Sequence, residues 1–232
     1  MKPTFVDDFT RPIVIDPAST ALVIVDMQNA TGSRNMGLGT VLARQGRTES
    51  AQYRFDRIDN VLVPNIRRLI DAFRANDAKV VYVTYGSNVP DFSDMPPHMI
   101  RIVKATNNRV GQTEHEIVDA LQPEPGDLVV NKTTQGAFGS TGIDSNLKAM
   151  GIETIVAVGV STNNCVAMTA MEACDRHYGV VVVSDGTGTD SDDMQQATLQ
   201  MLQRLWSRVL TTDEVIAELS GETKPGSQAA TA

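Results

Sequence analysis

The sequence predicts an α/β protein, a three-layer α/β/α sandwich around a mainly parallel sheet of six strands. Short runs of β-branched residues recur along the chain, and longer stretches with helical apolar spacing follow most of them. Several of these runs are apolar at every position rather than at alternate positions, which is typical of strands that helices cover on both faces. Alternating strands and helices, joined by right-handed connections, produce a parallel sheet between two helical layers.

The predicted strands are short and rich in valine and isoleucine. They cover residues 21–25, 79–85, 127–131, 154–159, 180–184 and 208–210. The clearest predicted helix spans residues 61–75, where apolar side chains fall near one helical face: Val61, Ile66, Leu69, Ile70 and Phe73. A shorter helix contains Leu147 and Met150 and can end at Gly151, and residues 166–177 also have helical character.

Two long segments interrupt the alternation of strands and helices. Residues 31–60 are polar, glycine-containing and rich in arginine, and residues 86–111 contain three prolines with little periodicity. Long loops in a compact domain are usually lids or binding loops, although either segment can instead be a surface excursion without function. We expect a single domain over residues 1–220, and a disordered tail over residues 221–232 because they are rich in Gly, Ser, Ala and Thr.

The composition bears on the partner and the compartment. The 232 residues are 41% hydrophobic and 21% charged, and the formal net charge is −8. This acidic balance argues against nucleic acid or an anionic membrane as the main partner, because both attract a basic surface. Two cysteines cannot form a disulfide framework, no export signal is visible, and no apolar run approaches the ~20 residues that span a bilayer. We therefore expect a cytoplasmic protein that acts on a small molecule.

Polar residues follow three of the predicted strands at their carboxyl ends, where parallel sheets bind ligands. Asp26 follows the first strand, Lys132 follows the third, and Cys165 comes soon after the fourth. Asn163 or Asn164 can cap a helix that begins beside Cys165, and the positive end of the helix dipole would then lower the pKa of the thiol. An acid, a base and a nucleophilic thiolate are therefore expected at one edge of the sheet.

Each of these residues also has an ordinary structural explanation. An aspartate after a strand often caps a turn, an isolated lysine is usually solvated, and a cysteine near a helix start is often a small buried hydrophobe. The combination, rather than any one residue, indicates a site. Cys174 lies about 180° around the same predicted helix from Cys165, so we expect it to be structural.

The remaining motifs are weak or absent. The histidines His98, His115 and His177 lack metal-binding spacing and the chain has no CxxC sequence, so we expect no metal site. The chain has no P-loop, and Gly186-Thr187-Gly188 lacks the third glycine of a dinucleotide-binding loop. No GxSxG sequence marks a serine hydrolase, and we expect no cofactor.

Three motifs in order resemble those of the isochorismatase-like cysteine hydrolases. They are residues 22–28 (LVIVDMQ), residues 130–132 (VNK) followed by Ala137-Phe138, and residues 159–166 (GVSTNNCV). Further matches downstream extend the resemblance over roughly residues 20–219: Ala173, Tyr178-Gly179 and Val183-Ser184-Asp185. Three motifs in the right order are a much stronger signal than any one of them.

The resemblance implies a catalytic triad, with Cys165 as nucleophile, Asp26 as general base and acid, and Lys132 as the cation that supports both. It also implies a cis peptide bond between Val160 and Ser161, and an oxyanion hole formed by the N–H groups of Ser161 and Cys165. In the implied mechanism, Asp26 takes the thiol proton, Cys165 attacks an amide-like carbonyl, and water hydrolyses the resulting thioester.

Departures from the family pattern narrow the predicted reaction. Nicotinamidases of the family hold a metal with histidines after the first strand, whereas residues 29–60 contain no histidine. Isochorismatases cleave a vinyl ether without a nucleophilic thiol, whereas Cys165 is present. These differences favour C–N hydrolysis in a small amide or ureido compound, such as an N-carbamoyl amino acid, ureidoacrylate, biuret or maleamate. The family also implies a homo-oligomer, a dimer or a tetramer.

Further residues are predicted to bind the substrate. Arg34, Arg44 and Arg47 can clamp a carboxylate, and Gln135 can hydrogen-bond a ureido group. The other candidates lie near strand ends or in the long segments: Gln28, Asn29, Tyr85 and Phe138. Solvation or oligomer contacts explain the arginines equally well, and core packing often explains the aromatic residues.

Two other functions stay open at this point. Ether hydrolysis by Asp26 and Lys132 would leave Cys165 idle, and a catalytically silent module would bind a metabolite or a partner protein without chemistry. The first predicts that Cys165→Ala keeps turnover. The second predicts that Cys165 reacts with alkylating agents no more selectively than Cys174.

Overall fold

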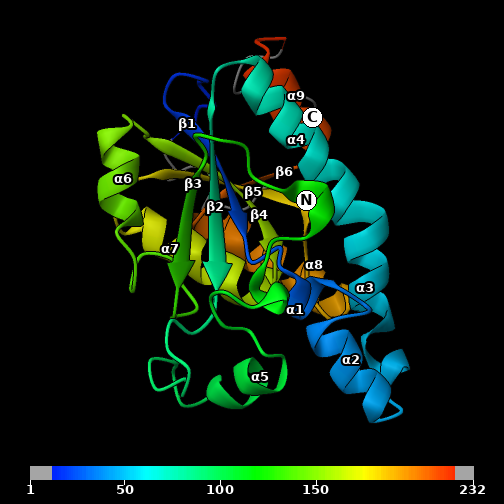
Figure 1. Ribbon diagram of the computed structural model, residues 1–232. Coiled ribbons are helices and arrows are strands. Elements are labelled where there is room, and N and C mark those ends of the chain that lie inside the picture. Colours follow the sequence, from blue (N-terminus) through cyan, green and yellow to red (C-terminus); the bar gives the residue numbers. More distant parts are fainter. Residues whose placement is uncertain (1–11, 223–232) are drawn as a thin grey trace.

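The computed structural model describes residues 12–222 and contains a six-stranded sheet (Figure 1). The strand order is β3-β2-β1-β4-β5-β6, and every neighbouring pair is parallel. The strands are β1 (Thr20–Val25), β2 (Lys79–Tyr85), β3 (Leu128–Lys132), β4 (Thr154–Val160), β5 (Gly179–Gly188) and β6 (Arg208–Leu210). The predicted α/β sandwich is confirmed, and each predicted strand is present.

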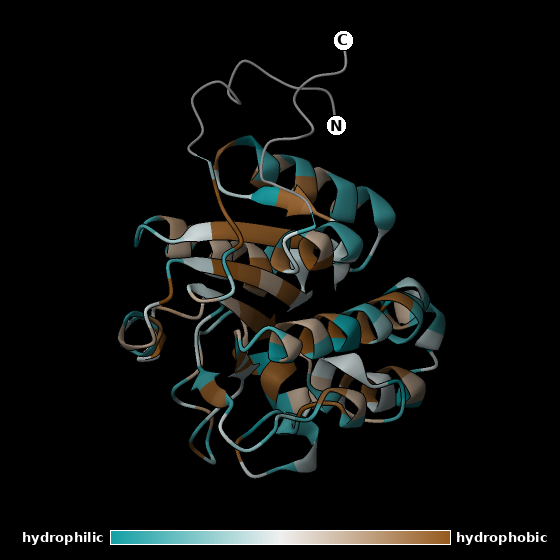
Figure 2. Ribbon diagram, turned by 90° about the horizontal axis from the view of Figure 1, so that it is seen from above, coloured by the Kyte–Doolittle hydropathy of each residue, from teal (hydrophilic) through white to brown (hydrophobic). Residues whose placement is uncertain are grey.

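Alternate residues of the strands point into two separate hydrophobic cores. In β1, Leu22 and Ile24 belong to one core, and Ala21, Val23 and Val25 belong to the other. Every residue of β1 is buried, as expected for a central strand that is covered on both faces. Seen from above, hydrophobic strands lie between helices of mixed polarity (Figure 2).

Five helices form the outer layers. They are α4 (Val63–Ala75) and α9 (Thr212–Leu219) over the first core, and α6 (Ile143–Ala149), α7 (Ala167–Cys174) and α8 (Asp192–Leu205) over the second. Figure 1 shows α4 and α9 side by side on one flank and α6 on the other. The side chain of Ser191 caps α8 by accepting from the N–H of Met194, and Thr211 with Glu214 forms a capping box at the start of α9.

Most of residues 31–60 are helical, so the prediction of a long polar loop was wrong. The segment contains α1 (Asn29–Gly32), α2 (Gly37–Arg44), η2 (Thr48–Ala51), α3 (Gln52–Arg57) and the π-helical η3 (Ile58–Leu62). The pieces within residues 31–51 are too short to show a clear helical period in the sequence, whereas α3 and η3 continue without a break into α4. Close packing also requires glycine here, because a Cβ atom on Gly39 would lie 1.9 Å from the carbonyl oxygen of Arg34.

The second long segment is less regular and packs beside the end of β2. It contains α5 (Ile100–Ala105), and Met95 and Val103 form a small cluster with Tyr85. Two short turns follow, η4 (Thr113–His115) and η5 (Asp119–Leu121). Residue 117 pairs with residue 28 in an isolated antiparallel bridge, so this part of the chain also reaches the edge of the sheet where β1 ends.

The predicted tail begins with two residues that end α9. Gly221 has a positive φ of 76°, and the N–H groups of Gly221 and Glu222 donate to the carbonyls of Glu218 and Ala217. The rest of the predicted tail, 223–232, lies outside the described residues. Within residues 12–222, no helix has the length and apolar character needed to cross a bilayer.

Candidate active site

The carboxyl ends of three strands lie near the point where the strand order of the sheet reverses. The chain places β2 and β3 on one side of β1, and then crosses to place β4, β5 and β6 on the other side. Ligands of parallel α/β proteins bind at such a switch point, beyond the carboxyl ends of the strands. Asp26 follows β1, Lys132 ends β3, and Cys165 follows β4, so the fold brings these predicted residues to one edge.

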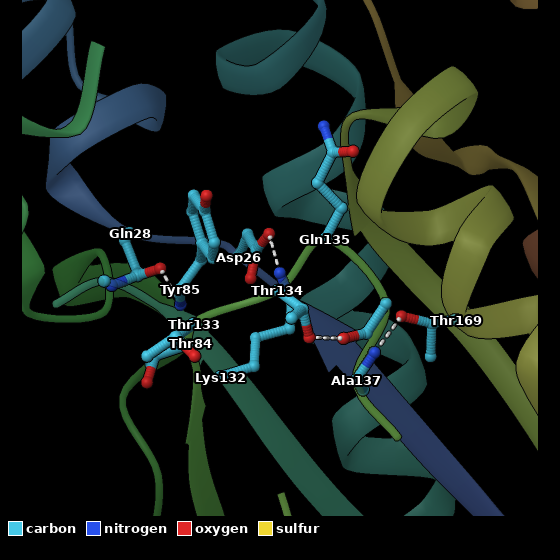
Figure 3. Close-up of polar contacts among 12 residues, drawn as sticks. Asp26, Gln28, Thr84, Tyr85, Lys132, Thr133, Thr134, Gln135, Ala137 and Thr169 are labelled. Carbon is cyan, nitrogen blue, oxygen red and sulfur yellow. Dashed lines mark hydrogen bonds and ion pairs between the residues drawn. The ribbon is translucent and has the colours of Figure 1, made fainter. Parts of the chain in front are cut away.

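Asp26 and Lys132 form a buried ion pair (Figure 3). Lys132 Nζ donates to Asp26 Oδ2 at 2.9 Å, and the exposed fractions of the two side chains are 0% and 7%. The backbone of Asp26 has a positive φ of 54°, and its N–H donates to the carbonyl of Val83 at 2.8 Å. Two charges this deeply buried are stable only as a pair, so each side chain holds the other in place.

Tyr85 covers another side of the same ammonium group. Tyr85 is opposite Lys132 in the β2–β3 register, and Lys132 Nζ lies 4.2 Å from the centroid of its ring, which is a cation–π contact. The Tyr85 hydroxyl is buried and has no hydrogen-bond partner among the described residues. Burial raises the pKa of Tyr85, and a negative charge on Cys165 or Asp26 raises it further, so the hydroxyl stays neutral beside these two residues.

The carboxylate of Asp26 is placed to accept a proton from the thiol. Burial raises the pKa of Asp26 above its ordinary value of 3.8, and the charge of Lys132 opposes that shift. The Cys165 thiol lowers the pKa of Asp26 as a hydrogen-bond donor. Asp26 Oδ1 is buried and has no well-aligned partner among residues 12–222, so one carboxylate oxygen binds Lys132 and the other is available to the thiol.

Burial of Cys165 works against the thiolate form that the sequence predicted. Cys165 is 7% exposed, and burial raises the pKa of its thiol to about 12, with the negative charge of Asp26 as the next largest cause. Lys132 opposes this shift but does not overcome it. Desolvation disfavours the thiolate, so a neighbouring base would help Cys165 to become nucleophilic.

The helix after β4 begins earlier than predicted. Its first turn is the π-helical η6 (Thr162–Val166), and Ser161 is the N-cap residue, so neither Asn163 nor Asn164 caps it. The Ser161 carbonyl accepts from the N–H groups of Asn164 and Val166, the residues on either side of Cys165. π-Helical turns are frequent at functional sites, and this one contains Cys165.

The peptide bond between Val160 and Ser161 is cis, as the family resemblance implies. Side chains from other segments anchor the residues that follow it. Thr162 Oγ1 donates to Gln195 Oε1, and Thr189 Oγ1 donates to Asn163 Oδ1, both at 2.6 Å. The sequence reasoning missed these anchors because their partners follow β5 and no motif connects them.

A third anchor, also missed, is Arg54 of α3. Its Nη1 donates to Ser161 Oγ at 2.8 Å, and its side chain is only 7% exposed. The burial of Arg54 could not be predicted, because its segment has the composition of a polar loop. Side-chain contacts to Ser161, Thr162 and Asn163 therefore hold the turn that carries Cys165.

Gln28 supports the site but its side chain is already engaged. Its Oε1 accepts from the N–H of Tyr85 at 2.7 Å (Figure 3), and its Nε2 donates to the carbonyl of His115 at 2.7 Å. A longer contact of 3.4 Å reaches Asn108 Oδ1. Gln28 therefore fixes the end of β2 and the position of Tyr85, and the prediction that it binds substrate does not fit these contacts.

Asn29 and Arg34 lie away from the triad. Arg34 pairs with Asp56 and Asp59, each at 2.6 Å, and Asn29 Nδ2 donates to the carbonyl of Thr113. Both residues line a cavity of about 330 Å³ between α1, η3 and η5 that contains none of the triad residues. Two carboxylates of the same chain already bind the guanidinium of Arg34, so the predicted clamp on a substrate carboxylate would require these pairs to open.

Gln135 and Phe138 follow Lys132 but have different surroundings. Gln135 reaches residues 98 and 99 of the second long segment, with its Oε1 3.4 Å from His98 Nε2 and its Nε2 3.6 Å from Met99 Sδ. The ring of Phe138 packs 5.8 Å from that of Tyr178, in the core under α6 and α7. Phe138 therefore packs in the same core as Cys165, and its role in substrate binding stays a prediction.

His115 lies near the triad and was not predicted there. Burial lowers its pKa below the ordinary 6.5, and its Nε2 lies 2.8 Å from Asn131 Oδ1. The second cysteine, Cys174, donates its S–H to the carbonyl of Trp206 at 2.7 Å, at the far end of α7. Within residues 12–222, no group of three or more His, Cys, Asp or Glu side chains is arranged to hold a metal ion.

Comparison with known proteins identifies the family of this chain. A family model described as the isochorismatase domain matches residues 20–214. The ureidoacrylate amidohydrolase RutB of Rhizobium rhizogenes is 31% identical over 225 residues, which are 90% of this chain and 87% of that protein. RutB of Agrobacterium fabrum is 30% identical over 90% of this chain and 94% of that protein.

Solved structures agree with the fold. An N-carbamoylsarcosine amidase from Thermoplasma acidophilum has a TM-score of 0.64 and is 29% identical, and the match covers 84% of this chain and 97% of that one. A cysteine hydrolase from Pseudomonas syringae has a TM-score of 0.71 and is 25% identical, and the match covers 92% of this chain and 99% of that one. On the strength of the domain match and of relatives that align over most of their length, this chain belongs to the isochorismatase family.

Proposed function

We propose that this protein is a cysteine-dependent amidohydrolase that cleaves the C–N bond of a small amide or ureido compound. The observation that carries the proposal is the buried pair of Asp26 and Lys132 beside the thiol of Cys165. A carboxylate that is held by a cation on one oxygen and faces a protonated thiol with the other is arranged for general base catalysis. The names of the amidohydrolase relatives support the same reaction class.

The proposed reaction has two halves. Asp26 accepts the thiol proton as Cys165 Sγ forms a bond to the carbonyl carbon, and the oxyanion is held by the N–H groups of Ser161 and Cys165. Asp26 then gives the proton to the leaving nitrogen, the C–N bond breaks, and a thioester remains. Water, activated by the same carboxylate, hydrolyses the thioester and regenerates the thiol.

Lys132 serves both halves by holding Asp26 in one orientation. Its charge also compensates whichever of the two acids is ionised, so one negative charge can pass between Asp26 and Cys165 without leaving the ion pair. The two groups therefore titrate as a coupled unit.

A ureido compound is the proposed substrate class. The relatives are named for ureidoacrylate and for N-carbamoylsarcosine, and both compounds carry a ureido group. The neutral hydroxyl of Tyr85 and the amide of Gln135 are the polar groups that we propose contact it. The homo-oligomer and the cytoplasmic location stay predictions.

Ammonia release by the purified protein tests the proposal. Wild type should release ammonia, without added metal, from at least one of biuret, ureidoacrylate, N-carbamoyl amino acids and maleamate, and Cys165→Ala should lose nearly all of this turnover. Cys174→Ala is the matched control and should keep it, because the Cys174 thiol binds the Trp206 carbonyl instead of the site. Full activity in Cys165→Ala, or turnover confined to isochorismate, would contradict thiol-dependent amide hydrolysis.

A further inference from the structure

Arg54 is a buried charge that contacts the turn before the nucleophile. Its Nη1 lies 2.8 Å from Ser161 Oγ and 3.2 Å from Asp190 Oδ1, and its Nε donates to the carbonyl of Thr31 at 3.1 Å. One guanidinium thus joins α1, the turn that begins at Ser161, and the segment between β5 and α8. The other two anchors of the turn, on Thr162 and Asn163, are contacts between neutral groups.

The two side chains of the ion pair between Arg54 and Asp190 differ greatly in solvent exposure. The Arg54 side chain is 7% exposed, whereas the Asp190 side chain is 74% exposed. A carboxylate in water is strongly solvated and screened, so it compensates a buried guanidinium only weakly. The neutral acceptors Ser161 Oγ and the Thr31 carbonyl must therefore satisfy much of the hydrogen-bonding demand of Arg54, because a buried charge without partners is costly.

We propose that Arg54 is a positioning residue that fixes the direction of the Ser161 N–H by holding the Ser161 hydroxyl. The inference rests on the proposed function, in which that N–H and the N–H of Cys165 hold the oxyanion. Oxyanion donors act through geometry, because they must point at charge that develops only in the transition state. A loosened Ser161 should therefore slow the chemical step and leave substrate binding nearly unchanged.

Arg57 provides a matched control on the same helix, α3. Its guanidinium donates to the backbone carbonyls of Thr187 and Ser184 on β5, at 3.0 Å and 2.8 Å, and not to Ser161. The substitutions Arg54→Lys and Arg57→Lys both keep the positive charge and both remove the planar fork of donors. Only the first should release the Ser161 hydroxyl.

Steady-state kinetics on the ureido substrate provide the main test. Arg54→Lys should lower kcat by about 10- to 100-fold and keep KM within about twofold, whereas Arg57→Lys should change neither by more than about twofold. Ser161→Ala, which keeps Arg54 but removes the contact, should lower kcat to a similar extent. The double variant of Arg54→Lys and Ser161→Ala should be no slower than the slower single variant, because both changes break one interaction.

Alkylation of Cys165 by iodoacetamide separates positioning from damage to the nucleophile. Alkylation forms an S–C bond with loss of iodide and develops no oxyanion, so its rate should be the same in wild type and Arg54→Lys. Additive losses in the double variant, a rise in KM in place of the fall in kcat, or slower alkylation would each overturn the inference. Hydrolysis that is unchanged by Arg54→Lys would refute this inference alone, whereas a wild type without hydrolysis would refute the proposed function and the inference with it.

Discussion

The ammonium nitrogen of Lys132 lies 2.9 Å from Asp26 Oδ2, and the exposed fraction of the lysine side chain is 0%. The two residues are 106 positions apart, at the ends of β1 and β3, and β2 runs between these strands. The pair therefore spans one strand of the sheet, and the Tyr85 ring at the end of that strand covers the ammonium. This arrangement makes the pair a structural element, and we propose that it is also a catalytic one.

Removing one partner of this pair should destabilise the protein. Lys132→Met leaves the Asp26 carboxylate buried without its cation, and breaking buried pairs in this way costs about 3–5 kcal/mol. Lys148→Met is the control, because Lys148 lies 2.8 Å from Asp144 but its side chain is 59% exposed, and surface pairs contribute less than about 1 kcal/mol. Urea unfolding of both variants compares the two losses, and equal losses would contradict the burial argument.

Neutralising Asp26 should make Cys165 easier to ionise while abolishing hydrolysis. The negative charge of Asp26 raises the pKa of the Cys165 thiol, so Asp26→Asn removes a cause of the raised value and leaves Lys132 to stabilise the thiolate. The midpoint of the pH profile for iodoacetamide alkylation should therefore fall in Asp26→Asn relative to wild type. A midpoint that stays or rises would show that Asp26 does not face the thiol.

The acid limb of the pH–rate profile should lie above the ordinary aspartate value of 3.8. Burial raises the pKa of Asp26, and only its ionised form can accept the thiol proton, so kcat/KM should fall as the pH decreases through this raised pKa. His115→Asn tests the assignment, because burial lowers the pKa of His115 and keeps the imidazole neutral near pH 7. The limb should be the same in this variant, and its disappearance would assign the titration to His115 instead.

The hydroxyl of Tyr85 should matter for substrate recognition, while the otherwise similar hydroxyl of Tyr82 should not. Both tyrosines lie on β2, and both hydroxyls are buried without a hydrogen-bond partner among the described residues. Tyr82 points into the opposite core, under α4, and burial raises its pKa to about 12. Tyr85→Phe keeps the ring over Lys132 and should raise KM for a ureido substrate by about tenfold, because one hydrogen bond to the substrate is lost.

The paired measurement decides this prediction. Tyr82→Phe should leave KM and kcat unchanged, and it controls for the loss of a buried hydroxyl from β2. Equal kinetics in the two phenylalanine variants would exclude a role for the Tyr85 hydroxyl in recognition.

Much of the fold was predictable because its signals are local. The valine-rich runs that became β1, β2, β4 and β5 are apolar at nearly every position, and a strand covered on both faces must be. The helix over residues 63–75 was visible because Ile66, Leu69, Ile70 and Phe73 repeat at helical spacing over several turns. Residues 31–60 were misjudged because their helices are four to eight residues long and owe their stability to tertiary packing rather than to periodicity.

The sequence alone was enough to predict the succession of strands along the chain and to place three residues, Asp26, Lys132 and Cys165, at or after the carboxyl ends of strands. Parallel strands place their carboxyl ends together whatever the details of packing, so these positions could be inferred. The burial of those residues and the side-chain contacts of their neighbours became known only from the tertiary structure. In the folded protein, burial raises the pKa of the Cys165 thiol. Arg34 pairs with Asp56 and Asp59, and Arg54 donates to Ser161. Desolvation and long-range side-chain pairing depend on which segments pack together, and no local pattern in the sequence encodes them.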